Sequence, residues 1–413
     1  MTSLQDIAQQ YVALVLATGQ HDPDYVDAYY GPPEWKTEAE AHPRTLTDLD
    51  GQAEQLEQRL ASLGRDPGTR RDVREAEMLG WRKAYLRKQL GALRTRLGML
   101  RGASLPFDEE SLALYDAVAG ERTEDEFRSV LDVLSRSLAG TGSVLGRYLA
   151  FRDRYLVPPE CLPQVCEAAL RACRTRTSDA LRLPHGEQCT LEFVTGKSWS
   201  GYNWYTGRAH SVIQINTDLP VHIDQVLDLA AHEGYPGHHV HNALIEQHLI
   251  REREWVEFTV YPLFSPQSLV AEGIANSAVT VAFSSSERLL FEREVLFPLA
   301  GLDPGTAARS AMTRVLVNRL ADAGVEAARR LLDGRLDDEG AVRWLEQYAL
   351  HSRPRAEQRV RFIRQYRSYV INYTRGRDLV EAWLTRKSGA DRARRWANLG
   401  DLMSSPRLAS SLQ

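Results

Sequence analysis

The stretch Asp228-Leu-Ala-Ala-His-Glu-Gly-Tyr-Pro-Gly-His-His239 organises this chain, because it combines a helical pattern with side chains that can bind a metal. Apolar or small residues recur along it at offsets of 3, 4, 7 and 11, the spacing of one helix face. These residues are Ile223, Val226, Leu227, Ala230 and Gly234. His232 therefore points away from the packed face of the predicted helix.

A His-Glu pair on a helix is typical of zinc peptidases, in which a second His four residues after the first completes the pair of imidazole ligands. In this sequence that position is Pro236, which cannot bind a metal. His238 and His239 come six and seven residues after His232, and an undistorted helix would place them roughly 9–10 Å further along its axis. Because Pro236 lacks a backbone donor and has glycines near it, we expect a kink or widened turn that returns His238 to His232.

The alternative is a surface helix that ends at Pro-Gly and carries histidines by chance. Four of the eleven histidines of the chain lie within residues 232–241, which favours a metal site. The second imidazole is either His238 or His239. We prefer His238, because it is one residue closer to His232 than His239 is. A widened turn therefore has to shorten the distance along the helix axis by less to bring it to His232.

A third ligand is expected from a separate helix, and Glu272 is the best candidate. Its neighbours are apolar: Leu269, Val270, Ile274, Ala278, Val279 and Val281. A carboxylate buried among them is costly, and a metal ion would compensate that cost. The alternative is a Glu on the solvated face of an ordinary helix. Asn276 and Asp228, each one helical turn from a candidate ligand, are expected to hydrogen-bond a ligating imidazole.

The run His-Glu-Gly-Tyr-Pro-Gly-His-His at 232–239, followed by Glu272-Gly273, resembles the domain-of-unknown-function 885 family, a mainly helical group related to zinc-peptidase-like proteins. The N-terminal segment 22–35, Asp-Pro-Asp-Tyr-Val-Asp-Ala-Tyr-Tyr-Gly-Pro-Pro-Glu-Trp, is similar to one branch of it. The resemblance implies a zinc site with His232, His238 and Glu272 as ligands and Glu233 as the base. It implies little about the substrate.

The length of 413 residues suits one large helical domain that encloses an active site, and no convincing linker divides it. We therefore predict a single, mainly α-helical, zincin-like domain over 1–413, with a helical scaffold at 1–183 and a metal-site half at 184–413. Residues 3–18 are predicted as a helix capped by Ser3, and the helical pattern from about 47 to 182 has breaks near Gly64–Gly68, Gly102–Pro106, Ala119–Arg122 and Val157–Pro159.

Charge and hydropathy exclude some partners. The formal net charge of −4 gives no electrostatic case for nucleic acid. No stretch has the pattern of a secretory signal or the length of a membrane span, so we expect a cytoplasmic protein with no membrane partner. The oligomeric state stays open.

A small β element is predicted just before the metal-binding stretch. Residues 190–194 and 211–216 have strand-like composition, and the segment between them, with Trp199, Tyr202, Trp204 and Tyr205, is predicted as a loop. Those aromatic side chains either form one wall of a cleft or only fill the loop. Because zinc peptidases often carry a strand along the cleft, Val212–Asn216 is expected to offer its edge to an extended substrate.

Two further residues are candidates for the site. Helices are predicted at 265–296, 304–333, 338–350 and 354–386, and the last carries Tyr366, Tyr369 and Tyr373 on one face. Tyr373 is the candidate donor to the oxyanion, and three core tyrosines are the alternative. His351, at a helix break, is a second candidate for the same role.

Together these residues predict a zinc-dependent hydrolase with one Zn²⁺ ion that cleaves a peptide or related amide bond, with Glu233 as general base. The substrate would then be a small peptide or amide. Two His and one carboxylate are also the ligands of non-haem iron oxygenases, although such an enzyme has no use for a base at Glu233. A catalytically inactive binding protein stabilised by metal is the other alternative.

Overall fold

The structure is a computed structural model that describes residues 3–63, 73–197, 199–218 and 220–413. The predicted break near Gly64–Gly68 lies outside these residues. The first part of the chain is helical apart from one short strand. Its elements are α1 (Leu4–Thr18), β1 (Val26–Tyr29), α2 (Pro33–Ala41), α3 (Leu46–Ser62), α4 (Val73–Leu100), α5 (Phe107–Tyr115), α6 (Glu124–Ser137), α7 (Val144–Arg152) and α8 (Leu162–Ala180).

The middle of the chain holds the remaining strands and the helices that follow them. Its elements are β2 (Gln188–Val194), β3 (Gly201–Gly207), β4 (His210–Asn216), α9 (Ile223–Leu229), the π-helical turn η2 (Ala230–Gly234), α10 (His238–Ile245), the π-helical turn η3 (Glu246–Arg251), β5 (Val260–Pro262) and α11 (Pro266–Ala282).

The last part is again helical. Its elements are α12 (Ser285–Phe291), the π-helical turn η5 (Glu292–Leu296), α13 (Phe297–Leu299), α14 (Ala307–Asn318), α15 (Ala323–Leu332), α16 (Asp338–Tyr348), α17 (Arg353–Tyr366), the 3-10 turn η7 (Arg367–Val370), α18 (Ile371–Ser388) and α19 (Arg392–Met403). The protein is therefore mainly helical with small sheets, and the predicted fold class is confirmed at that level.

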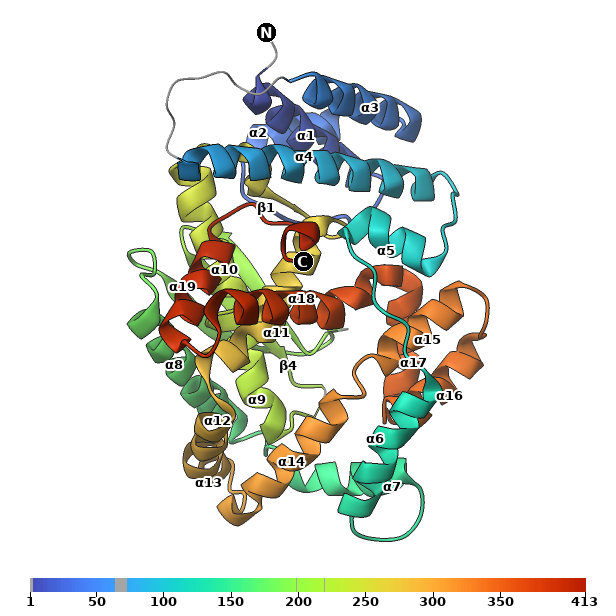
Figure 1. The fold of residues 1–413 in the computed structure, drawn as a ribbon, viewed down its shortest axis with the longest axis vertical. Helices are drawn as coiled ribbons and strands as arrows, with labels where there is room; N and C mark the ends of the chain where they lie inside the picture. The colour runs from blue at the N-terminus through green and yellow to red at the C-terminus, as the bar shows by residue number, and fades with distance from the viewer. Residues whose placement is uncertain (1–2, 64–72, 198, 219) are drawn as a thin grey trace.

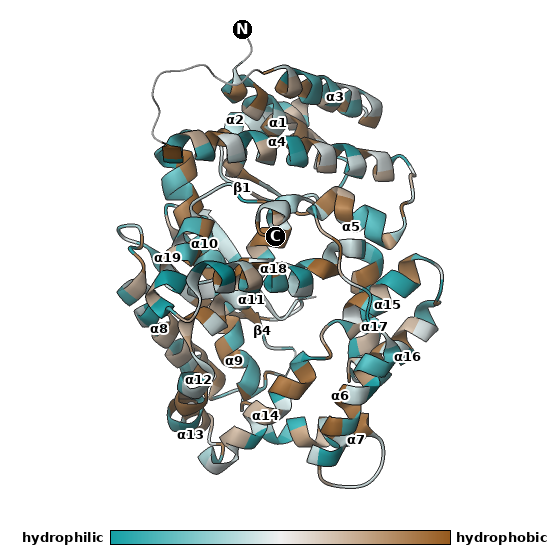
Figure 2. Cartoon of the chain, in the orientation of Figure 1, coloured by the Kyte–Doolittle hydropathy of each residue, from teal (hydrophilic) through white to brown (hydrophobic). Residues whose placement is uncertain are grey.

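Local signals placed several of these helices correctly. The Ser3 hydroxyl accepts a hydrogen bond from the backbone of Asp6, and the Asp6 carboxylate accepts one from the backbone of Ser3, so the predicted cap of α1 is present. The predicted breaks at 102–106 and 119–122 separate α4 from α5 and α5 from α6. Figure 2 shows that outer helices such as α3 and α4 carry both hydrophobic and hydrophilic residues, as expected for helices with one buried face.

The β element differs from the prediction. The segment expected as a loop contains β3, and the sheet order is β2-β4-β3, with β2 parallel and β3 antiparallel to β4. The central strand β4 is hydrogen-bonded on both sides, so Val212–Asn216 has no free edge for a substrate and that prediction is wrong. The run Gly201-Tyr-Asn-Trp-Tyr-Thr-Gly207 extends because its aromatic residues and Thr favour strands.

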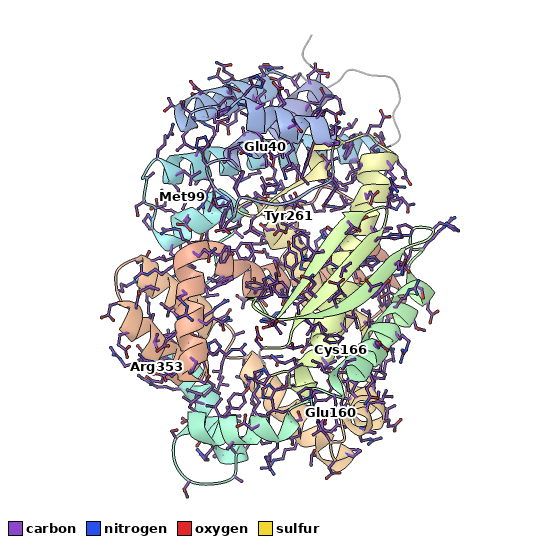
Figure 3. The ribbon with its side chains drawn as sticks, turned by 180° about the vertical axis from the view of Figure 1, so that it is seen from behind. Glu40, Met99, Glu160, Cys166, Tyr261 and Arg353 are labelled. Carbon is purple, nitrogen blue, oxygen red and sulfur yellow. The ribbon has the colours of Figure 1, made fainter. Side chains whose placement is uncertain are left out.

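A second, two-stranded sheet joins distant parts of the chain. β1, from the N-terminal segment, pairs antiparallel with β5, which directly precedes α11. In Figure 3, the three-stranded sheet and helix α17, which begins at the labelled Arg353, lie on opposite sides of the view, and Tyr261 of β5 lies between them. The N-terminal segment thus reaches the strand that leads into α11.

Helix α11 lies in the middle of the molecule and crosses behind α18 in Figure 1. It is buried over nearly its whole surface, as its sequence of mostly apolar and small residues suggests. The crossing is close because glycines face each other: a Cβ atom on Gly273 would lie 2.5 Å from the carbonyl oxygen of Gly376. This contact holds α18 against the part of α11 that carries Glu272.

The predicted continuous helix 354–386 is wrong, because α17 ends at Tyr366 and Arg367 has a positive φ of 52°. Buried Glu110 of α5 stabilises the break. Its carboxylate accepts hydrogen bonds from the Arg367 guanidinium and from both the backbone and the hydroxyl of Ser368. The tyrosines expected on one face belong to three elements, although their rings still adjoin: the centroids of Tyr366 and Tyr369 are 6.2 Å apart. Within the described residues, no helix is long and apolar enough to cross a bilayer.

Candidate metal centre

The His-Glu stretch adopts the widened turn that its sequence predicts. Helix α9 passes into the π-helical turn η2, and the backbone N–H of Tyr235 closes that turn on the carbonyl of Ala230 at 3.2 Å. The chain then folds back onto the helix. A Cβ atom on Gly237 would lie only 1.9 Å from the carbonyl oxygen of His232, so this close return requires glycine. Helix α10 starts at the next residue, His238.

This return brings His238 beside His232. Their ring centroids are 4.7 Å apart and the ring planes are nearly perpendicular, at 85°. The Glu272 carboxylate approaches both from α11: its oxygens lie 3.5 Å from Nε2 of His232 and 3.9 Å from Nε2 of His238. One ligand atom from each of the three residues lies within 4.8 Å of the others, which is compact enough to hold one ion.

The protonation states of these groups suit a cation. Burial lowers the pKa of His232 to about 4, and burial together with the charge of His232 lowers the pKa of His238 well below its usual value. Both imidazoles are therefore neutral near pH 7, the form that binds metals. Burial raises the pKa of Glu272 to about 7, although hydrogen bonds from Tyr369 and Asn276 oppose this effect.

Two more carboxylates lie near the cluster. Burial and the charges of Glu272 and Asp27 raise the pKa of Glu233 to about 8, and burial also raises the pKa of Asp27. Within the described residues, none of these three carboxylates forms an ion pair with Lys or Arg. A buried set of acids without a cationic partner is costly, and a divalent cation would favour their ionised forms. The donor set therefore fits a divalent metal.

Glu233 lies at the edge of this cluster. Its Oε1 is 4.0 Å from Nε2 of His232, and the side chain is not one of the three that converge. Its backbone carbonyl accepts a hydrogen bond from the Asn203 amide of β3 at 2.7 Å. Gly201 allows β3 to pass close to Glu233 and Leu229. A Cβ atom at this position would lie 3.5 Å from Oε1 of Glu233 and 2.4 Å from the side chain of Leu229.

His239 points away from the cluster, toward the three-stranded sheet. Its Nδ1 lies 2.8 Å from the Ser211 hydroxyl and its Nε2 lies 3.0 Å from the carboxylate of Glu187. Burial alone would raise the pKa of Glu187, but hydrogen bonds from His239, Tyr235 and Arg174 outweigh this effect and lower the pKa to about 2. These contacts fasten the first turn of α10 to the sheet.

Neither residue expected to hydrogen-bond a ligating imidazole does so. Asp228 pairs with Arg288 at 2.6 Å, because its side chain lies on the side of α9 that faces α12. Asn276 donates to the backbone carbonyl of Glu272 at 2.8 Å and to the Glu272 carboxylate at 3.4 Å, because both residues lie on the same face of α11. Asn276 thus positions the carboxylate.

The structure adds tyrosines and an aspartate that the sequence did not single out for this role. The Tyr369 hydroxyl donates to Oε1 of Glu272 at 3.1 Å, and the Tyr202 hydroxyl donates to Asp27 at 2.9 Å. Burial raises the pKa of Tyr261, and the charge of Glu272 raises it further. Only the pairing of β1 with β5 brings Asp27 and Tyr261 here, and no local sequence signal specifies that pairing.

Of the aromatic residues between β2 and β4, Tyr202 reaches the site through Asp27 and stacks on Trp199, with ring centroids 5.6 Å apart. Tyr205 points elsewhere and donates to the Glu246 carboxylate, while Trp204 is largely exposed. These side chains therefore divide between the site, the core and the surface.

The two remaining candidates occupy different places. Tyr373 is half-buried, its ring centroid lies 5.7 Å from that of Tyr369, and burial followed by the charge of Glu272 raises its pKa. It therefore adjoins the cluster. Within the described residues, the ring of His351 makes no hydrogen bond or ring contact with the cluster, and its backbone N–H donates to the carbonyl of Leu345.

Comparison with other proteins supports the fold. No family model and no curated protein matches the sequence. A solved structure from Colwellia psychrerythraea, described as a "putative lipoprotein", is similar over 98% of this chain and 76% of its own, with 13% identity and a TM-score of 0.53. One from Shewanella oneidensis, described in the same words and as of unknown function, is similar over 100% and 87%, with 11% identity and a TM-score of 0.50. At such low identity, these similarities show a shared fold alone.

Proposed function

We propose that this protein is a zinc-dependent hydrolase that cleaves a peptide or related amide bond. The observation that carries the proposal is the position of Glu233, a buried carboxylate beside three convergent metal-binding side chains but not among them. A site that only stabilised the fold would have no need of this additional acid. The resemblance to the domain-of-unknown-function 885 family supports the same proposal.

In this proposal His232, His238 and Glu272 hold the ion. Bound there, zinc would lower the pKa of a water molecule and polarise a substrate carbonyl. Glu233 is within reach of the same place and would accept the proton of that water. Tyr369 and Asn276 hold the carboxylate of Glu272 in position, and Tyr373 would donate a hydrogen bond to the oxygen on which charge develops.

The site residues predict a defined metal content. Purified protein is expected to contain about one zinc per chain by elemental analysis, and to lose activity on a peptide library when treated with a chelator. His238→Ala is expected to lose the metal. In His239→Ala the ion should remain, because that side chain bonds Ser211 and Glu187 instead. Iron in place of zinc would favour an oxygenase, and zinc without hydrolysis would favour a binding protein.

Tyr373→Phe tests the proposed oxyanion donor, since it removes one hydroxyl and keeps the ring. We expect kcat to fall by roughly 10²–10³-fold with KM nearly unchanged, the pattern of a lost transition-state contact. Tyr369→Phe is the matched comparison, because its hydroxyl bonds Glu272 and its loss should weaken metal binding instead. An unchanged kcat in Tyr373→Phe would remove this residue from the mechanism.

We extend the proposal to three further properties of the protein. They are a cytoplasmic location, a small peptide or amide as substrate, and no nucleic-acid or membrane partner.

A further inference from the structure

Three arginines lie close enough for their charges to interact, and one of them, Arg359, has its guanidinium carbon 5.8 Å from the ring centroid of Tyr373. Arg355 and Arg359 are one helical turn apart on α17 and so share a face. Arg152 ends α7, and its charge acts on Arg355, as does that of Arg359. We call Arg152, Arg355 and Arg359 the arginine cluster. Within the described residues, none of the three forms an ion pair with a carboxylate, whereas the buried arginines Arg82 and Arg329 each do.

Burial and position make this cluster unusual. The side chain of Arg355 is exposed to solvent, yet burial, together with the charge of Arg152, lowers its pKa. Arg359 is partly buried, and its guanidinium carbon lies 4.7 Å from the ring centroid of Phe362 and 5.8 Å from that of Tyr373. Burial also lowers the pKa of Arg359. Holding the positive charges of the arginine cluster close together is unfavourable, and a bound anion would offset this cost.

Unpaired polar atoms surround the same place. Both ring nitrogens of His222, a residue only 4% exposed, have no hydrogen-bond partner among the described residues, and neither do Nδ1 of His351 and Nε of Arg152. An antiparallel bridge between Leu156 and His222 joins this histidine to the segment that follows Arg152. Such buried atoms are normally paired, and unpaired ones indicate where a ligand or water binds.

Asp224 is the acidic residue that approaches the cluster. The charge of Arg152 acts on it, but no ion pair forms, and its Oδ1 is among the buried atoms without a partner. The three guanidinium groups outnumber this carboxylate. The metal-binding cluster, by contrast, is rich in carboxylates, so the two places differ in sign.

Tyr373 connects the two. The Arg359 guanidinium carbon lies 5.8 Å from its ring centroid. The ring centroids of Tyr373 and Tyr369 are 5.7 Å apart, and the Tyr369 hydroxyl donates to Glu272. The arginine cluster therefore lies a few residue lengths from Glu272, since an extended chain advances about 3.3–3.6 Å per residue. A short peptide can span that distance.

We propose that the arginine cluster binds a carboxylate of the substrate, so that the enzyme acts on short peptides whose negative charge lies within a few residues of the bond that is cut. The inference that this carboxylate belongs to a substrate rests on the proposed hydrolase function. The existence of a carboxylate-binding site at the arginines does not depend on that function. The carboxylate has two sources, the free C-terminus of a peptide or an acidic side chain. Guanidinium groups suit both, because they bind carboxylates through paired hydrogen bonds.

Peptide binding to a Glu233→Gln protein tests the proposal without turnover. Three sets of N-acetylated pentapeptides are compared by mass spectrometry of the fraction retained: free acids without acidic side chains, amides with one Glu, and amides without any acid. Retention of either charged set over the neutral set is expected, and the set retained identifies the source. Equal retention of all sets, or of none, would overturn the proposal.

Substitutions then locate the site. In the same background, Arg359→Gln and Arg355→Gln are each expected to weaken binding of the retained set by about 10–100-fold, the usual range for a lost charged hydrogen bond. Arg359→Lys should restore part of the affinity. Arg361→Gln, an exposed position on the same helix, is the matched control. Unchanged affinity in both glutamine variants, with thermal unfolding as in the control, would refute the site.

The two proposals can fail separately. Peptides that bind through the arginines but are never hydrolysed would refute the hydrolase and leave the carboxylate site in place. Peptides hydrolysed equally by wild type, Arg355→Gln and Arg359→Gln would refute the carboxylate site and leave the hydrolase in place.

Discussion

Glu233→Gln is expected to keep its zinc and to lose activity by about 10²–10⁴-fold, the range for loss of a general base. The amide keeps the shape of the side chain and removes its basicity. Glu233 lies beside the ligands and outside the convergent set, so its loss leaves three donors for the ion. Its backbone contact with Asn203 is unaffected, so the local fold should persist.

The matched variant is Glu272→Gln, which changes a carboxylate within the convergent set. It is expected to lose the ion as well as the activity, because an amide is a much poorer ligand than a carboxylate. Zinc content by elemental analysis, measured beside kcat, separates the two variants. Loss of zinc in Glu233→Gln would make this residue a ligand and would leave the mechanism without a base.

Gly237→Ala is expected to lower the free energy of unfolding by about 3 kcal/mol or more and to abolish zinc binding. The added methyl group would meet the carbonyl oxygens of His232 and Ala231 at 1.9 and 2.3 Å. These are backbone atoms within a hydrogen-bonded turn, so no side chain can rotate to make room. Relief requires the turn to open, which moves His238 away from His232.

Urea unfolding and zinc content measure both effects. Gly80→Ala is the control, because a Cβ atom there meets nothing within 4 Å and alanine favours a helix. It should leave the unfolding midpoint unchanged or slightly higher. A folded Gly237→Ala protein with full zinc and the wild-type midpoint would show that the turn is more adaptable than this contact allows.

Features that depend on neighbours in the sequence could be predicted without the structure. The cap at Ser3, the long helix α4 and the widened turn at Pro236 follow from hydrogen bonds and backbone angles within a few residues. The same holds for the approach of His238 to His232, since both lie on one continuous turn. Glu272 was found because a carboxylate in an apolar helix is anomalous wherever that helix lies.

Errors arose where a feature depended on distant parts of the chain. Whether β4 is an edge or a central strand depends on β3, whose glycines and asparagine made it resemble a loop. The end of α17 depends on Glu110, more than 200 residues away in the sequence. Asp228 was expected near His232, but Arg288 of α12 binds it instead.

The sequence by itself determined a mainly helical protein and the residues that can bind a metal, because helical periodicity, turn chemistry and ligand type are local properties. Only the tertiary structure decided which side chains surround those residues. Asp27 comes from β1, Tyr369 from the turn before α18, and the arginine cluster from α7 and α17. These contacts depend on the packing of helices and strands far apart in the chain, and sequence spacing carries no information about which of them meet.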